Sequence, residues 1–202
     1  MRLRVVLLVL AAAVTAALIW RATERTTTHR TSAPPPSAVS LVGDSLNVGI
    51  ESDLRGLLPG WRFGADDELG RPTATGLERL RAAGSSLSPY VVISLGTNDP
   101  STVVDAFRRA VEEVLQLAGP HRCVVWATIH REGDAYAAFN EILRSEAARN
   151  RNLRLVEWSN MIERDRNLLA ADGIHGTPDG YRARAEAVIE QLRACYDAGV
   201  TA

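Results

Sequence analysis

The sequence predicts an α/β domain in which helices cover both faces of a parallel sheet. Beyond about residue 38, short runs of β-branched and aliphatic residues alternate with longer stretches whose apolar residues have helical spacing. Polar residues follow several of the short runs. Because ligands of open α/β sheets bind beyond the carboxyl ends of the strands, these polar residues also predict the edge at which a site would lie.

Two segments precede this domain. Residues 1–20 carry two early arginines and then an uncharged, predominantly apolar run that ends at Trp20, which predicts an export signal or membrane anchor. The run is long for a cleaved signal and has no convincing small-residue cleavage site, so we favour an uncleaved anchor over a cleaved signal peptide. Residues 21–37 are rich in threonine and proline and predict a linker. The domain is then expected to span residues 38–202, outside the cytoplasm.

Each predicted strand is a short run of apolar residues between turn signals, and helical stretches lie between the strands. The helix after the third strand is predicted to start with Asp99 as its N-cap and to end at Gly119. The last helix has equally good start signals in Thr177 and the proline that follows it. The predicted strands span residues 38–42, 61–65, 90–95, 123–128 and 153–157.

Composition excludes several functions. The formal net charge of -1 gives no reason to expect nucleic acid as a partner. All 23 lysine and arginine positions are arginine. The absence of lysine excludes a P-loop lysine, a Schiff base with a carbonyl substrate or pyridoxal phosphate, and a Ser–Lys dyad.

The chain has two cysteines, Cys123 and Cys195, and their separation matches no zinc-finger spacing. Cys123 begins the fourth predicted strand, and Cys195 lies late in the last predicted helix. If that helix runs antiparallel to the strand, both thiols lie at the same end of the sheet. A disulfide is then possible, and two buried free thiols are the alternative.

Four short blocks of polar and glycine residues carry the chemistry. They occur in a fixed order, after each of the first three strands and before the last helix. They are Gly43-Asp44-Ser45-Leu46, Gly70, Gly96-Thr97-Asn98-Asp99 and Asp172-Gly173-Ile174-His175.

Together the blocks supply each part of an acyl-transfer site. Ser45 is a hydroxyl nucleophile at the first turn of a helix, where backbone N–H groups are unpaired. His175 is the expected general base, and Asp172 can hold its ring and stabilise its charged form. The backbone N–H groups of Ser45 and Gly70, with the side-chain amide of Asn98, can form an oxyanion hole.

With these residues, the chain resembles the SGNH/GDSL hydrolase family from about residue 38 onward. Ser45, Gly70, Asn98 and His175 match the four signature residues of the family, and Asp172 matches its Asp-x-x-His motif. The resemblance implies a three-layer, flavodoxin-like sandwich with a five-stranded parallel sheet. It also implies serine esterase, lipase or acyltransferase activity that needs neither a metal nor another cofactor.

The chain departs from common members of that family at two points. Gly176 stands where proline often follows the histidine, and long insertions between the blocks are missing, which argues against a deep, lidded pocket. Taken singly, the site residues also have structural interpretations as helix caps, turn residues or a surface loop pair. Their joint occurrence in this order favours a site.

Three further residues are candidate substrate contacts. Arg71, beside Gly70, can hold a carboxylate or sugar hydroxyls. His130 and Arg131 follow the fourth strand at the same edge of the sheet. For all three, a place in a solvated loop is the simpler interpretation.

The sequence therefore predicts an exported, monomeric serine esterase with a Ser45–His175–Asp172 triad. The expected substrates are small-molecule or glycan esters with short acyl groups, such as acetyl esters on cell-surface glycans. The expected membrane contact is through the N-terminal segment. Two alternatives remain open: an O-acyltransferase that acts on a glycan hydroxyl, and a non-catalytic glycan-binding module.

Overall fold

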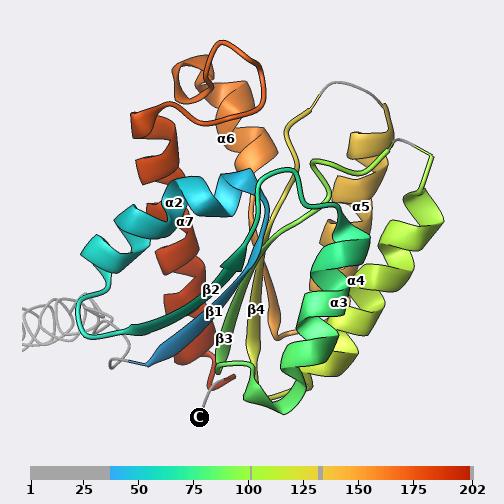
Figure 1. Cartoon of the computed structure of the whole chain (residues 1–202), viewed down its shortest axis with the longest axis vertical. Helices are drawn as coiled ribbons and strands as arrows, with labels where there is room; N and C mark the ends of the chain where they lie inside the picture. Colours follow the sequence, from blue (N-terminus) through green and yellow to red (C-terminus); the bar gives the residue numbers. More distant parts are fainter. Residues whose placement is uncertain (1–36, 101, 132–133, 201–202) are drawn as a thin grey trace, which may run out of the picture. The chain divides into compact units, whose positions relative to one another are not determined.

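The computed structural model describes residues 37–100, 102–131 and 134–200. A five-stranded parallel sheet lies between two layers of helices (Figure 1), with the strand order β2-β1-β3-β4-β5. The predicted α/β fold is thereby confirmed. The strands are β1 (Ala38–Gly43), β2 (Arg62–Asp67), β3 (Tyr90–Ser94), β4 (Cys123–Ala127) and β5 (Leu153–Val156). The α-helices are α2 (Ser45–Leu57), α3 (Thr73–Ala83), α4 (Val104–Ala118), α5 (Asp134–Arg149), α6 (Trp158–Arg164) and α7 (Pro178–Asp197). Two 3₁₀ turns are η1 (Gly84–Ser86) and η2 (Arg166–Leu168).

The expected anchor, residues 1–20, lies outside the described residues, as does the expected linker apart from residue 37. Within the described part of the chain, no helix is long and apolar enough to cross a membrane.

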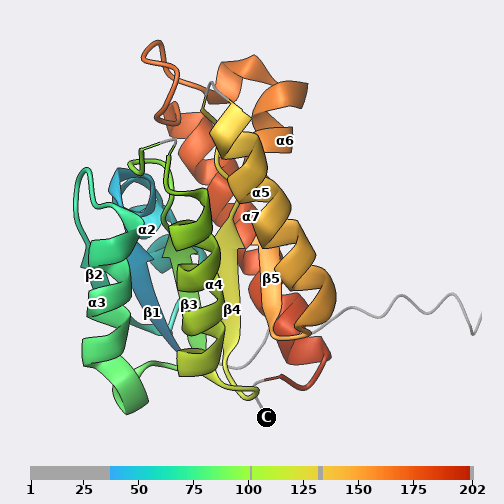
Figure 2. The same ribbon diagram turned by 90° about the vertical axis from the view of Figure 1, so that its right-hand side faces the viewer.

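Side-chain alternation along the strands explains the two layers of helices. In β4, Cys123 and Val125 pack on the face covered by α2 and α7, while Val124 and Trp126 pack on the face covered by α3, α4 and α5. Figure 2 shows the second of these faces, with α3, α4 and α5 in front of the sheet. All five residues of β3 and of β4 are buried, and all but Ser94 are apolar or aromatic, as is usual for strands covered on both faces. That property is what made the strands recognisable in the sequence.

The helix after β3 does not start where the sequence predicts. It begins at Val104, and its N-cap is Val103 rather than Asp99. The Asp99 carboxylate instead accepts a hydrogen bond from Thr73 N at 2.8 Å, at the start of α3. The N-cap of α3 is Pro72, which makes no side-chain capping bond. Asp99 is therefore a capping residue, but for a helix that precedes it in the chain by 26 positions.

The last helix starts as predicted, with Thr177 as N-cap and a proline in the first turn. It runs antiparallel to β4, and a disulfide joins Cys195 on this helix to Cys123 at the start of β4. Of the two alternatives for the cysteines, the structure therefore contains the disulfide. The bond lies at the end of the sheet opposite the carboxyl ends of the strands.

Candidate active site

Ser45 lies at the carboxyl edge of the sheet, as the first residue of α2. The turn from β1 into α2 is tight: a Cβ on Gly43 would lie 2.7 Å from the Asn47 side chain, so glycine is required there. Asp44 is the N-cap and accepts a hydrogen bond from Leu46 N at 3.0 Å. Among the described residues, the backbone N–H of Ser45 has no protein acceptor, as is usual for the first turn of a helix.

His175 and Asp172 lie in the loop before α7, which the backbone holds in place. Leu169 and Gly176 form an antiparallel bridge, and the carbonyl of His175 accepts from Ala170 N at 2.8 Å. One oxygen of Asp172 accepts the backbone N–H groups of the two residues that follow Gly173, at 2.9 and 3.0 Å. Gly176, the departure from the family pattern, is therefore part of an ordered bridge.

The three side chains form one chain of hydrogen bonds. His175 Nε2 lies 2.9 Å from Ser45 Oγ, and His175 Nδ1 lies 2.7 Å from Asp172 Oδ2. Hydrogen bonds from the His175 side chain and from two backbone N–H groups hold the pKa of Asp172 well below its usual range. A carboxylate that is ionised near neutral pH can orient an imidazole and stabilise its cation. The side chains of His175 and Asp172 are 38% and 51% exposed, so the arrangement is open to solvent.

The structure also places the expected oxyanion donors at this edge. Gly70, in the loop after β2, has φ +73°, a conformation that favours glycine. Asn98 follows β3, and its Nδ2 donates to Asp44 Oδ2 at 3.2 Å and to the carbonyl of Arg71 at 3.3 Å. To bind an oxyanion, Asn98 would exchange the longer of these two bonds for the substrate.

The Arg71 side chain does not lie in a solvated loop, and its contact with a substrate stays a prediction. The Arg71 side chain is 4% exposed, and its guanidinium pairs with Asp66 near the end of β2 and with Glu68 just after it. The same guanidinium donates to the backbone carbonyl of Asp66. A buried guanidinium with carboxylate partners nearby is a structural group that shapes the β2–α3 loop. The Arg71 backbone carbonyl, which accepts from Asn98, is the part of the residue that faces the site.

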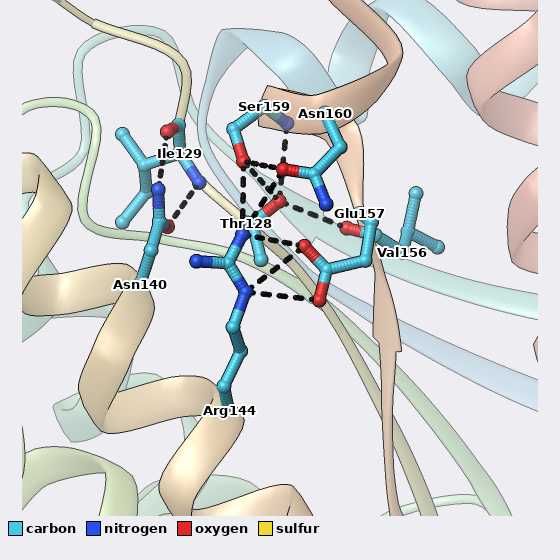
Figure 3. A network of polar contacts seen from close by, with 8 residues as sticks. All are labelled: Thr128, Ile129, Asn140, Arg144, Val156, Glu157, Ser159 and Asn160. Atoms are coloured by element: carbon cyan, nitrogen blue, oxygen red, sulfur yellow. Dashed lines mark hydrogen bonds and ion pairs between the residues drawn. The ribbon is translucent and has the colours of Figure 1, made fainter.

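His130 and Arg131 lie beside the Asp172 loop, where they line a depression together with Arg166 and Ile174. Arg131 Nη1 donates to the carbonyl of Thr97 at 2.6 Å. The strand end that carries these two residues is fixed by side chains (Figure 3). The amide of Asn140 accepts from Ile129 N at 2.7 Å and donates to Ile129 O at 2.8 Å, and Thr128 and Ser159 bond each other. The contact of His130 and Arg131 with a substrate stays a prediction.

Sequence analysis missed the residues beneath Ser45. Asp44, Ser94 and Arg184 are buried there and joined by hydrogen bonds. In the sequence, Asp44 is a typical N-cap residue and Ser94 lies within a predicted strand, so neither indicates a buried polar contact. A signal for Arg184 exists in the sequence, because it lies at helical spacing from the apolar residues Val188 and Leu192 of α7.

No group of three or more metal-ligating side chains occurs within the residues that the structure describes. No protein-family model matches the chain, and no curated protein matches it in sequence. Solved structures do match it in fold. One of them is the C-terminal catalytic domain of peptidoglycan O-acetyltransferase A from Streptococcus pneumoniae, solved with a methylsulfonyl adduct. The match has a TM-score of 0.63 and 17% sequence identity, and it covers 81% of this chain and 94% of the solved chain.

Two further structures make the same point. A lipolytic G-D-S-L family protein from Veillonella parvula has a TM-score of 0.63 and 18% identity, covering 76% of this chain and 96% of that one. A family 3 carbohydrate esterase from Clostridium thermocellum has a TM-score of 0.61 and 16% identity, covering 79% and 98%. The chain thus has the SGNH/GDSL fold, found in esterases and acyltransferases. The resemblance inferred from its four sequence blocks is confirmed for the fold.

Proposed function

We propose that this domain is an exported serine hydrolase that cleaves carboxylic esters through Ser45, His175 and Asp172. The observation that carries the proposal is the unbroken chain of hydrogen bonds at 2.9 and 2.7 Å between these three side chains. Ser45 and His175 are 130 positions apart in the sequence, and a capping serine has no need of a histidine and a carboxylate behind it. Their arrangement is the one that activates a hydroxyl for attack on a carbonyl.

In the proposed mechanism each group has one step. His175 Nε2 takes the proton of Ser45 Oγ as that oxygen attacks the ester carbonyl, and the imidazolium is stabilised by Asp172. The oxyanion forms beside the free N–H of Ser45, with Gly70 N and Asn98 Nδ2 as further donors. His175 then gives its proton to the leaving alcohol, which leaves an acyl-enzyme. Water, activated by the same imidazole, resolves the acyl-enzyme to acid and free serine.

The test uses the purified chain, an aryl acetate and a fluorophosphonate probe. We expect wild type to hydrolyse the ester and to be labelled on Ser45, as shown by mass spectrometry of the intact protein and mapping of the modified peptide. Ser45→Ala should lose both signals, because it removes the nucleophile and leaves the fold intact. A folded wild type that neither turns over nor is labelled would contradict the proposal. Glycan affinity without turnover, unchanged in Ser45→Ala, would favour a binding module.

For the substrate we propose short acyl esters, such as acetyl groups on cell-surface glycans. The half-exposed side chains of His175 and Asp172 support an open site that a bulky glycan can approach. His130 and Arg131, beside the Asp172 loop, are the proposed glycan contacts. Two structures of similar fold point the same way, because one is named a carbohydrate esterase and the other a peptidoglycan O-acetyltransferase.

An extracytoplasmic location is part of this proposal. The apolar N-terminal run supports export, with a retained anchor proposed in preference to cleavage. The disulfide between Cys123 and Cys195 supports it independently, because such bonds persist mainly in oxidising compartments. Partition of the full chain between membrane and soluble fractions distinguishes a retained anchor from a cleaved signal.

Transfer of the acyl group to a glycan hydroxyl is the second candidate, supported by the structural likeness to peptidoglycan O-acetyltransferase A. The residues and the acyl-enzyme would be the same, and a sugar hydroxyl would replace water in the second step. Wild type would be incubated with an aryl acetate and candidate glycan acceptors. Acetylated glycan in place of free acetate would favour the transferase, and free acetate alone would favour the esterase.

A further inference from the structure

A positive charge is enclosed beneath the candidate nucleophile. Arg184, on α7, is 1% exposed, and its guanidinium lies 5.1 Å from the ring centre of Trp158. Its Nη2 donates to Ser94 Oγ at 2.9 Å, while its Nε and Nη1 have no hydrogen-bond partner among the described residues. A buried and incompletely bonded cation is unfavourable unless an anion offsets its charge.

The offsetting anion is Asp44, the residue before Ser45. Asp44 is 0% exposed, and its link to Arg184 runs through Ser94, whose Oγ lies 3.0 Å from Asp44 Oδ1. A guanidinium has donors only, so Ser94 Oγ must accept from Arg184. The single hydroxyl proton of Ser94 then points at Asp44, and the direction of the relay is fixed.

Every side-chain contact of Asp44 requires it to accept. One oxygen accepts from Leu46 N at 3.0 Å and from Ser94 Oγ, and the other accepts from Asn98 Nδ2 at 3.2 Å. A carboxylate can accept all three bonds, whereas a protonated carboxyl would turn one oxygen into a donor. Burial raises the pKa of Asp44, and the charge of Arg184 opposes that rise.

We propose that Arg184 is a positioning residue, which supplies the charge that keeps Asp44 an acceptor and thereby fixes the Asn98 amide and the first turn of α2. The proposal rests on the ester chemistry proposed above. Without that charge, Asp44 would take up a proton and lose its bond from Asn98, so the amide would no longer be held facing the developing oxyanion. The same change would loosen the turn that carries Ser45.

The first test compares Arg184→Met with Arg182→Met on aryl acetate. Arg182 lies on the same helix, is exposed and pairs with Asp53 and Glu186, so its replacement removes an equal charge away from Asp44. We expect Arg184→Met to lower kcat by about ten- to a hundredfold, in the range for a misplaced oxyanion donor, with KM within about threefold. Arg182→Met should keep wild-type kcat and KM. A wild-type kcat for folded Arg184→Met would overturn the proposal.

The second readout is the pH profile of kcat/KM, which a purely structural role would leave unchanged. In Arg184→Met the acidic limb should move to higher pH, because Asp44 is protonated more easily. Arg184→Lys, which keeps a charge, should restore part of the rate and return the limb toward wild type. Asp67 at the end of β2 and Tyr181 on α7 are the other titratable groups coupled to Asp44. An unshifted limb, or no rescue by lysine, would contradict the role.

A stability cycle keeps the proposal testable without turnover. Arg184→Met should be less stable than wild type, and this loss of stability should become larger as pH rises. The reason is that a buried Asp44 without a compensating cation is tolerated only when it is protonated. In an Asp44→Asn background, the effect of Arg184→Met should not change with pH. An identical pH trend in both backgrounds would overturn the coupling. A wild type inactive on every ester would instead defeat the proposed function, and this cycle would still decide the role of Arg184.

Discussion

The two oxygens of Asp172 accept hydrogen bonds from different partners, and an asparagine at this position could replace only one of them. One of its oxygens accepts two backbone N–H groups of its own loop, and the other faces His175 Nδ1 at 2.7 Å. In Asp172→Asn, the amide oxygen would stay with the backbone donors, so the NH₂ group would face Nδ1. That arrangement favours the tautomer with its proton on Nε2, which cannot accept the proton of Ser45. We expect kcat on aryl acetate to fall by about 10³–10⁴-fold with little change in KM.

Asp179→Asn is the matched control for this variant, since Asp179 lies in the first turn of α7, four positions beyond His175. It removes the same charge from the same region without touching the imidazole, and we expect kcat within about twofold of wild type. Equal losses in the two variants would show that local charge, and not orientation of His175, determines the rate. Because the native pKa of Asp172 is depressed, its stabilising contribution is present above the unfolded pKa and is lost as pH falls.

Asp67 predicts a pH dependence of stability with the opposite sign. Burial raises its pKa to about 6, against the effect of its hydrogen bond from Asn47, and its Oδ2 has no partner among the described residues. Since the native state binds the proton more tightly than the unfolded state, stability falls as pH rises from about 4 to 6 and is flat above that. Asp67→Asn should remove this loss and gain about 1–3 kcal/mol at pH 7 in urea titrations.

The neighbouring Asp66 supplies the contrast to Asp67. Burial acts to raise its pKa, but hydrogen bonds from Arg79 and Arg71 lower it overall. Asp66→Asn should therefore lose stability at neutral pH and approach wild type as pH falls. The same pH trend for both asparagine variants would contradict the assignments.

At the scale of single residues, the sequence could predict groups whose chemistry is specific, such as Ser45 and His175. It could not predict how arginines are used. Arg71 follows a signature glycine in a loop, which suggests exposure, yet the loop folds back so that Asp66 and Glu68 pair with its buried guanidinium. Arg184 interrupts an apolar stripe, and only the tertiary structure places Ser94 and Asp44 against it.

At the scale of elements, α2 and α7 must pack closely because one carries Ser45 and the other begins just beyond His175. A Cβ on Gly49 of α2 would lie 2.2 Å from the Tyr181 ring of α7. Gly49→Ala should therefore push the helices apart, cost about 1–3 kcal/mol of stability and lower kcat by lengthening the Ser45–His175 contact. Chemical denaturation and aryl acetate kinetics measure the two effects.

Gly56→Ala is the matched control on the same helix, because a Cβ there meets nothing within 4 Å. It should leave kcat unchanged and raise stability by about 0.5–1 kcal/mol, through the helix propensity of alanine. Wild-type stability and rate in Gly49→Ala would show that the α2–α7 contact can relax, and would remove the argument that this packing sets the site.

The elements themselves were predictable to different degrees. The central strands β3 and β4 are short apolar runs buried on both faces, so their sequence alone locates them within about two residues. The start of α4 was not predictable in this way. Asp99 has the sequence signature of a local cap, but its carboxylate is satisfied by Thr73 N on a different helix. Capping is recognised locally in sequence, whereas the partner is chosen by the packing of whole elements.

At the scale of the whole molecule, the strand order explains why the site assembles. In the order β2-β1-β3-β4-β5, the chain runs from β1 to the edge strand β2 and then crosses back to β3, so the connections after β1 and β3 leave toward opposite faces of the sheet. Ser45 follows β1 and Asn98 follows β3, so the two residues lie on either side of the switch point between these strands, where ligands of such sheets bind. The alternation of strands and helices in the sequence predicts a parallel sheet, and in such a sheet the segments that follow the strands meet at the carboxyl edge. The sequence could therefore predict the edge at which the four site blocks meet, because the topology of the sheet, and not local propensity, brings them together.

The disulfide ties this architecture together at the opposite edge, where it joins the start of β4 to the end of α7 across a separation of 72 positions. Closing a loop of that length lowers the conformational entropy of the unfolded chain and thereby raises its free energy by about 4 kcal/mol. Replacing Cys123 and Cys195 by alanine should therefore lower the free energy of unfolding by about 2–5 kcal/mol. The rate of the folded fraction at 25 °C should stay within about twofold of wild type, because the bond lies far from Ser45 and His175.

Reduction of wild type should lower its Tm to that of the double variant and should leave the Tm of the double variant unchanged. Native labelling of both thiols by iodoacetamide, with a Tm insensitive to reductant, would show that the bond does not form, and would also remove one of the two supports for an oxidising location.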